Sequence, residues 1–175
     1  MDLKDALRTL HHSRCFIEGI YSGFRTIVEI RIYNDDNESF ALAEISHEAV
    51  DYLGVDVFNP KNYEEAIKEN RAWNELGIYK EDVYKAVETI SQYFKWNEDT
   101  ERIIQEDLDV QYRILQINNN LKKYRFYDDE YSIHGLSVYD YEYYRFLEGK
   151  IAEQIEELNL KVKEIENGKT KEKAI

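Results

Sequence analysis

The sequence predicts an α+β fold that is predominantly α-helical, with one antiparallel β-hairpin at about residues 26–45 packed on amphipathic helices and a long C-terminal helix. Two observations predict it. Only one proline and seven glycines occur in 175 residues, and apolar side chains recur mostly every three or four positions, the period of an α-helix. Residues 26–33 instead alternate, with Val28, Ile30 and Ile32 on one face, the period of a β-strand.

The first third of the chain is expected to contain a helix followed by the hairpin. A three-and-four spacing of apolar residues predicts an N-terminal amphipathic helix that ends near Gly23. A polar turn at residues 34–37 separates the alternating strand from a second strand at residues 40–45. Ser46 has the character of a helix N-cap, which predicts a short helix closed by Gly54.

Three more helices are expected in the middle of the chain. The Asn-Pro pair at residues 59–60 is a start signal for a helix that ends at Gly77. The spacing of apolar residues predicts a further helix at about residues 81–96. A fourth helix is expected to start after Asn97 and to run to about Lys122.

The C-terminal part is expected to be one long helix. An irregular stretch at residues 125–136 precedes this helix, which covers about residues 139–166 and is followed by a frayed basic tail at residues 167–175. We therefore divide the chain into a helical α+β domain at residues 1–138 and the long helix that continues from it. A heptad seam on this helix predicts pairing with the N-terminal helix or with a second copy in a homodimer. The seam residues are Leu147, Ile151, Ile155, Leu158, Val162 and Ile165.

The negative charge is concentrated in the middle of the chain. Of all residues, 36 are acidic and 23 are basic, which gives a net charge of −13. Residues 34–110 carry 20 acidic and seven basic side chains, also a net of −13, whereas both flanks are nearly neutral. A protein that wraps nucleic acid or rests on an anionic membrane is thereby excluded, because both partners repel such a surface. We expect a protein partner.

The predicted fourth helix has an acidic ridge opposite its apolar stripe. Its members are Glu98, Glu101, Glu106 and Asp109. Two interpretations are open, a solvated helix face or a decoy whose carboxylates replace phosphates in a nucleic-acid-binding groove. Asp107, Gln111 and Asn118 lie near the centre of the stripe, which also contains Leu108 and Leu115. A buried carboxylate requires a partner, so the helix either is rotated toward solvent at its start or borders a wet groove.

Tyrosine is unusually frequent just before the long helix and at its start. Seven of the 15 tyrosines lie between residues 124 and 144, interleaved with basic residues. Tyrosine and arginine are favoured at protein interfaces, and the acids in the same segment favour a protein over single-stranded nucleic acid. Codon bias of an AT-rich genome is the alternative explanation. The candidate contact residues are Tyr124, Tyr127, Tyr131, Tyr139 and Tyr143.

Signals for catalysis are sparse. His11, His12 and Cys15 lie together, and a helix would place His11 and Cys15 one turn apart, a spacing that suits two metal ligands. No second Cys/His cluster completes a four-ligand site, and neither a glycine-flanked serine nor a phosphate-binding loop occurs. We expect no catalytic residues, no metal and no cofactor. A small metal-dependent enzyme around this cluster remains the second alternative.

The remaining observations concern compartment and class. A single cysteine, no signal sequence and no membrane-spanning run predict a cytoplasmic protein. In composition the chain is similar to small, acidic, tyrosine-rich, proline-poor proteins of phages and mobile elements of low-GC bacteria, anti-CRISPR and anti-restriction inhibitors among them. The resemblance implies a non-enzymatic, acidic protein-binding module that inhibits a nucleic-acid-handling host or defence protein. The first alternative is a structural protein that assembles through its C-terminal helix.

Overall fold

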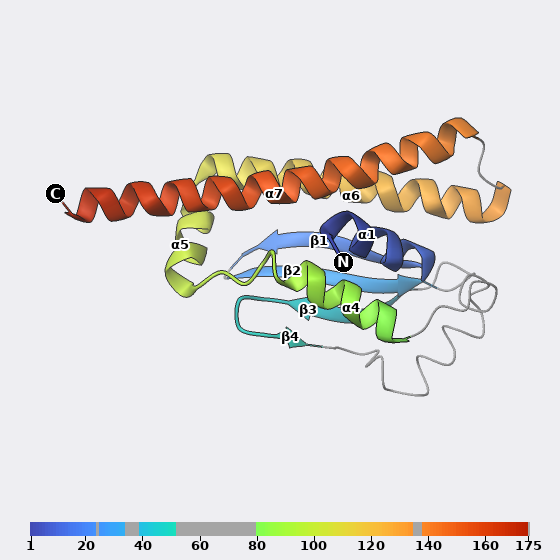
Figure 1. Ribbon diagram of the computed structural model, residues 1–175, viewed down its shortest axis with the longest axis horizontal. Helices are drawn as coiled ribbons and strands as arrows, with labels where there is room; N and C mark the ends of the chain where they lie inside the picture. The colour runs from blue at the N-terminus through green and yellow to red at the C-terminus, as the bar shows by residue number, and fades with distance from the viewer. Residues whose placement is uncertain (24, 34–38, 52–79, 135–137, 175) are drawn as a thin grey trace.

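The computed structural model describes residues 1–23, 25–33, 39–51, 80–134 and 138–174. This part of the chain contains five helices and a four-stranded antiparallel sheet, which confirms the predicted fold class (Figure 1). The strands are β1 (Cys15–Ser22), β2 (Thr26–Tyr33), β3 (Ser39–Ile45) and β4 (Val50–Asp51). The helices are α1 (Leu3–His12), α4 (Lys80–Ser91), α5 (Glu98–Glu106), α6 (Leu108–His134) and α7 (Val138–Ala174).

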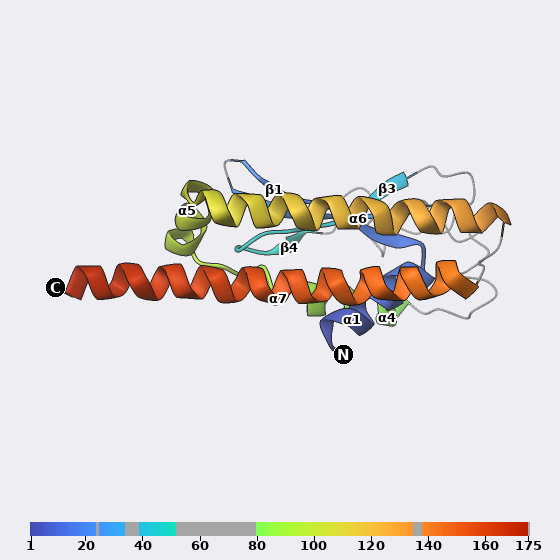
Figure 2. The same cartoon turned by 90° about the horizontal axis from the view of Figure 1, so that it is seen from above.

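The sheet is a meander in which each strand pairs with the next one along the chain. Strands β2 and β3 form the predicted hairpin. Val28, Ile30 and Ile32 are fully buried, while the residues between them are partly exposed, as the alternation predicts. Helices α1 and α4 cover one face of the sheet, and the buried residues of β2 belong to the same core as those of both helices (Figures 1 and 2).

The N-terminal helix is much shorter than predicted, because the chain enters β1 at Cys15. Strand β1 pairs with β2 through a register shift that leaves Glu18 as an extra residue, a β-bulge. Ile17 and Ile20 pair with Ile30 and Val28, which share one face of β2, so the two isoleucines also share a face despite their spacing of three. The bulge therefore gives a strand the apparent period of a helix.

The turn after β3 replaces the short helix predicted there. The Ser46 hydroxyl accepts hydrogen bonds from the N–H groups of Glu48 and Ala49, at 3.3 and 3.4 Å. A serine that accepts in this way stabilises a turn as well as a helix N-terminus, so the residue type alone does not distinguish them. The turn returns the chain into β4. The predicted turn at residues 34–37, Gly54 and the helix at residues 59–77 lie outside the described residues.

The helix boundaries in the second half also differ from the prediction. The helix expected after Asn97 is broken at Asp107, whose carboxylate accepts a hydrogen bond from the N–H of Val110 at 3.0 Å and caps the start of α6. Helix α6 then continues to His134, through most of the stretch expected to be irregular. Helix α7 continues to Ala174, through the tail expected to fray.

Helices α6 and α7 form a long antiparallel pair along one edge of the sheet (Figure 2). At 1.5 Å per residue, the 37 residues of α7 extend for about 55 Å. The seam predicted on α7 faces α6 of the same chain, with further contacts to α1 and α5. Five of its residues are buried and Ile165 packs against the same core. The seam is therefore buried within the chain, mainly against α6.

Helix α6 lies along β1, an edge strand of the described sheet, whose backbone groups would otherwise lack partners. The Asn118 side chain accepts a hydrogen bond from the N–H of Ile20 at 2.7 Å and donates one to the C=O of Ile20 at 2.8 Å. Seven residues earlier, Gln111 accepts a hydrogen bond from the Ser22 hydroxyl at 2.6 Å. The polar residues expected to need partners thus find them on the edge strand.

Arg125, seven residues after Asn118, continues this row. Its guanidinium forms an ion pair with Glu18, the bulge residue, which also accepts a hydrogen bond from the Tyr33 hydroxyl at 2.7 Å. Burial alone would raise the pKa of Glu18, but the hydrogen bonds from Arg125 and Tyr33 outweigh it and lower that pKa. Burial and the bond to Glu18 raise the pKa of Tyr33 to about 12. We call Gln111, Asn118 and Arg125 the edge row.

Replacement of Asn118 by leucine is expected to lower the free energy of unfolding by about 2 kcal/mol, because it leaves the N–H and C=O of Ile20 without partners. The matched control is Asn119→Leu, which makes the same change at an exposed position of the same helix and should alter that free energy by less than about 0.5 kcal/mol. Urea denaturation of both variants measures the difference. An equal loss in the two variants would contradict the role of Asn118.

Candidate functional site

The predicted acidic ridge is only partly exposed. Its exposed members are Glu98, Glu106 and Asp109. Glu101 is only 5% exposed, so its place on a solvated ridge was predicted wrongly. Helix α5 turns this carboxylate toward the end of the sheet, where it accepts a hydrogen bond from the N–H of Thr26 and lies 2.5 Å from Nδ1 of His47. The buried Glu101 therefore connects α5 to β2 and to the β3–β4 turn.

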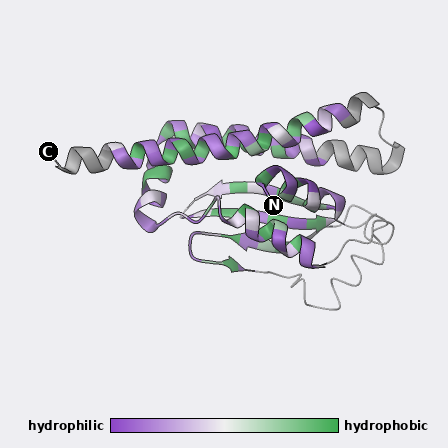
Figure 3. Ribbon diagram, viewed as in Figure 1, coloured by the Kyte–Doolittle hydropathy of each residue, from purple (hydrophilic) through white to green (hydrophobic). Residues whose placement is uncertain are grey.

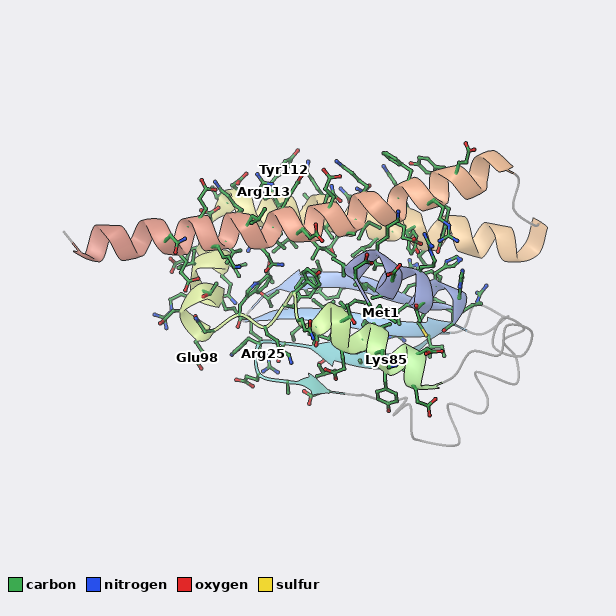
Figure 4. The ribbon with its side chains drawn as sticks, in the orientation of Figure 1. Met1, Arg25, Lys85, Glu98, Tyr112 and Arg113 are labelled. Atoms are coloured by element: carbon green, nitrogen blue, oxygen red, sulfur yellow. The ribbon has the colours of Figure 1, made fainter. Side chains whose placement is uncertain are left out.

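A cavity of about 600 Å³ lies between this end of the sheet and α5. Its wall is made by Arg25 from the β1–β2 turn, by His47 and Glu48 from the β3–β4 turn, and by residues of α5 that include Glu98 and Glu101. Figure 4 shows Arg25 and Glu98 at this end of the molecule, and Figure 3 shows that α5 is hydrophilic at its start. The cavity is therefore lined mainly by charged side chains.

Of the titratable side chains that line the cavity, those of His47 and Glu101 are the most buried. The His47 side chain is 12% exposed, and neither ring nitrogen is accessible to solvent or completes a hydrogen bond. Nδ1 lies at ion-pair distance from Glu101, and Nε2 lies 3.6 Å from a carboxylate oxygen of Glu48. No spacing motif connects His47 to α5, because the two segments are about 50 residues apart in the sequence. Sequence reasoning missed this cluster for that reason.

The outer side of α6 carries a second feature, an apolar strip. Leu108, Tyr112 and Leu115 follow one another at i, i+4 and i+7, and they are 84%, 59% and 55% exposed. Figure 4 shows Tyr112 and Arg113 on α6, on the side away from the sheet. Leu108 and Leu115 were expected in the buried stripe, and this expectation is wrong. Ile114 and Leu121 of the predicted stripe are buried, but the break at Asp107 changes the phase of the helix, so Val110 and Ile117 take the core positions expected of Leu108 and Leu115.

The candidate tyrosines have different surroundings. Tyr124 is buried, its ring stacks on Tyr144 with 4.4 Å between centroids, and its hydroxyl donates to Glu148 at 2.9 Å. Tyr124 is therefore a core residue, and its expected place on a contact surface is wrong. Tyr143 is exposed and stacks with the exposed Phe146. The other three have side chains outside the described residues, namely Tyr127, Tyr131 and Tyr139.

Glu148 is a fully buried carboxylate at the junction of three helices. Arg8 of α1 binds it at 3.0 Å, Arg145 of α7 lies 3.3 Å away, and Tyr124 of α6 donates a hydrogen bond to it. A buried charge is tolerated when it is paired and hydrogen-bonded, and removal of one partner is strongly destabilising. All the contacts of Glu148 named here come from the protein itself and hold helices together, so we assign it a structural role.

The predicted cluster of His11, His12 and Cys15 does not have the helical arrangement expected of it. Cys15 is the first residue of β1, so it no longer shares a helix face with His11. The thiol is fully buried, and burial raises its pKa. The His11 ring lies 4.1 Å from that of Tyr144, and burial, with a smaller effect from neighbouring positive charges, lowers its pKa well below the ordinary value. These residues belong to the packing of α1 against β1 and α7.

Comparison with known proteins assigns no role to these features. No protein-family model matches the chain, and no curated protein or solved structure matches it either. Among the described residues, no helix combines the length and the apolar character needed to cross a bilayer. Function is therefore inferred from the cavity and the surfaces described above.

Acidification is expected to destabilise the fold through His11. The pKa of His11 is lowered on folding, so near pH 5 to 6 the unfolded chain takes up a proton that the folded chain does not. The contribution of neutral His11 to the unfolding free energy is therefore fully present above the unfolded-state pKa of about 6.5 and is lost as the pH falls below it. Between pH 7.5 and 5.0, the wild type should lose up to about 2 kcal/mol more unfolding free energy than His11→Phe, which keeps a ring against Tyr144. Urea denaturation at both pH values measures this. Identical losses would show that His11 does not titrate on unfolding.

Proposed function

We propose that the protein is a non-enzymatic binding module that contacts a protein partner through the outer side of α5 and α6. The observation that carries the proposal is the apolar strip of Leu108, Tyr112 and Leu115, which folding leaves exposed. Single exposed apolar residues are ordinary on protein surfaces, but three of them at i, i+4 and i+7 form the pattern with which a helix docks into a groove. Burial of each such side chain contributes about 1.5–3 kcal/mol.

The charge beside the strip indicates the chemistry of the partner. Residues 97–109 contain six acidic side chains and one basic side chain, and Glu98, Glu106 and Asp109 are exposed. Asp109 is shared with Arg113 and Lys161, at 3.2 and 3.8 Å, so Glu98, Glu106 and the likewise exposed Asp99 provide most of the available negative charge. We call the strip together with Glu98, Glu106 and Asp109 the contact surface. The partner surface that complements it is basic and borders an apolar groove.

Basic surfaces of this kind are characteristic of proteins that bind nucleic acid. We therefore propose that the partner is a nucleic-acid-handling protein, and that the acids of the contact surface compete with phosphates for its basic residues. In this proposal the protein acts in the cytoplasm as an inhibitor of a host or defence protein, in the manner of the phage and mobile-element proteins that it resembles in composition. Assembly through the C-terminal helix is the weaker candidate, because α6 covers the seam on α7.

The experiment captures partners on the tagged protein and measures the affinity of the purified partner for each variant. The double variant Tyr112→Ala/Leu115→Ala should weaken binding at least about 30-fold. This factor corresponds to about 2 kcal/mol, the binding energy lost when a single hot-spot residue is removed. Glu106→Lys should weaken binding and reduce its dependence on salt, whereas Glu153→Lys, the same charge change at an exposed position of α7, should not. The partner's own nucleic acid should displace the protein.

The folding of the binding variants is checked by denaturation. Leu115→Ala should change the free energy of unfolding by less than about 0.5 kcal/mol. Ile114→Ala, the neighbouring buried position, should lower it by about 3 kcal/mol. Full binding by the Tyr112→Ala/Leu115→Ala and Glu106→Lys variants, or a partner that nucleic acid does not displace, would contradict the proposal.

A further inference from the structure

The cavity beside α5 gathers three side chains of the types that bind transition-metal ions. One ligand atom each from His47, Glu48 and Glu98 lies within 4.8 Å of the other two. His47 and Glu48 come from the β3–β4 turn, and Glu98 is the first residue of α5. Imidazole and carboxylate are the ligands of many three-residue zinc sites, in which water takes a fourth position. The folded chain thus brings together a donor set from two distant segments.

The second observation is the state of His47. Both ring nitrogens are shielded from solvent and neither completes a hydrogen bond, although each lies at ion-pair distance from a carboxylate. Nδ1 faces the buried carboxylate of Glu101, which the N–H of Thr26 holds in place. Nε2 is directed to the side of Glu48. A carboxylate behind one nitrogen with the other nitrogen directed at a ligand cluster is the usual arrangement of a metal-binding histidine.

The negative charge at the cavity also favours a bound cation. Glu48 and Glu98 place two carboxylates close together, and Glu101 adds a third negative group behind His47. Two exposed cations also line the cavity, namely Arg25, which lies 3.1 Å from Glu48, and Arg102, so the acids outnumber the basic side chains there by one. Like charges at this separation repel one another, and a divalent cation between them removes the repulsion.

We propose that His47, Glu48 and Glu98 bind one divalent transition-metal ion of the Zn²⁺ class, with Glu101 as the positioning residue of the imidazole. Histidine in the set favours Zn²⁺ over Mg²⁺ and Ca²⁺, which prefer ligands that are all oxygen. The ion joins the β3–β4 turn to the start of α5. The site shares Glu98 with the contact surface, but Zn²⁺ binding by the isolated chain does not require the proposed partner.

The test is calorimetric titration of the metal-free full-length chain with Zn²⁺, supported by the visible absorption spectrum of the Co²⁺ form. We expect one Zn²⁺ per chain and a Co²⁺ absorption spectrum typical of a four-coordinate site. Glu98→Gln changes an exposed side chain and leaves the core intact. It should weaken Zn²⁺ binding more than the loss of a residue that only supports a metal ligand, which costs about 10- to 100-fold. His47→Gln should abolish binding.

Two controls separate this site from binding elsewhere on an acidic chain. Glu106→Gln removes an exposed acid near the end of the same helix and should leave Zn²⁺ binding unchanged. His12→Gln changes the exposed histidine of the N-terminal cluster and should also leave Zn²⁺ binding unchanged. Circular dichroism confirms that each variant is folded, and Zn²⁺ should raise the melting temperature of the wild type but not of Glu98→Gln. Absence of Zn²⁺ binding, or equal binding by the wild type and Glu98→Gln, would overturn the proposal.

Discussion

The edge of strand β1 is the constraint on which the arrangement of the helical layer depends. An edge strand needs partners for its outward backbone groups, and Asn118 provides both a donor and an acceptor for Ile20. Gln111 and Arg125, one heptad to either side, bind Ser22 and the bulge residue of the same strand. This edge row fixes the rotation of α6 about its own axis. The core contacts then occupy one neighbouring face, and the apolar strip is left on the outer one.

Much of the fold follows from local patterns in the sequence. The hairpin of β2 and β3, the long last helix and the burial of its seam are all present, because alternating and heptad spacings directly reflect which side of an element is buried. The predicted elements are wrong where a single residue shifts the periodicity of buried side chains along the chain. Glu18 adds a bulge that gives β1 a spacing of three, and Asp107 ends one helix and caps the next. Neither residue has an unusual neighbourhood in the sequence.

The candidate sites were less predictable than the fold, since they depend on contacts between distant segments. Glu101 is one turn after Glu98 on α5 and both line the cavity, yet Glu101 is buried against Thr26 whereas Glu98 is exposed. His47 and Glu98 come together only because the β3–β4 turn and α5 meet at the same end of the sheet. The exposed acids and the apolar strip, by contrast, are local to residues 98–115. Only their orientation required the structure, and the edge row sets it.

The most direct measurement of this dependence is native-state hydrogen exchange at the amide of Ile20, followed by NMR. If Asn118 completes the edge of the sheet, this amide exchanges only through opening of the structure, with a free energy close to that of amides in the central strand β2. Exchange of the Ile20 amide at nearly the rate of an unprotected amide, while β2 stays protected, would show that α6 does not close the edge and would contradict the orientation on which the contact surface rests.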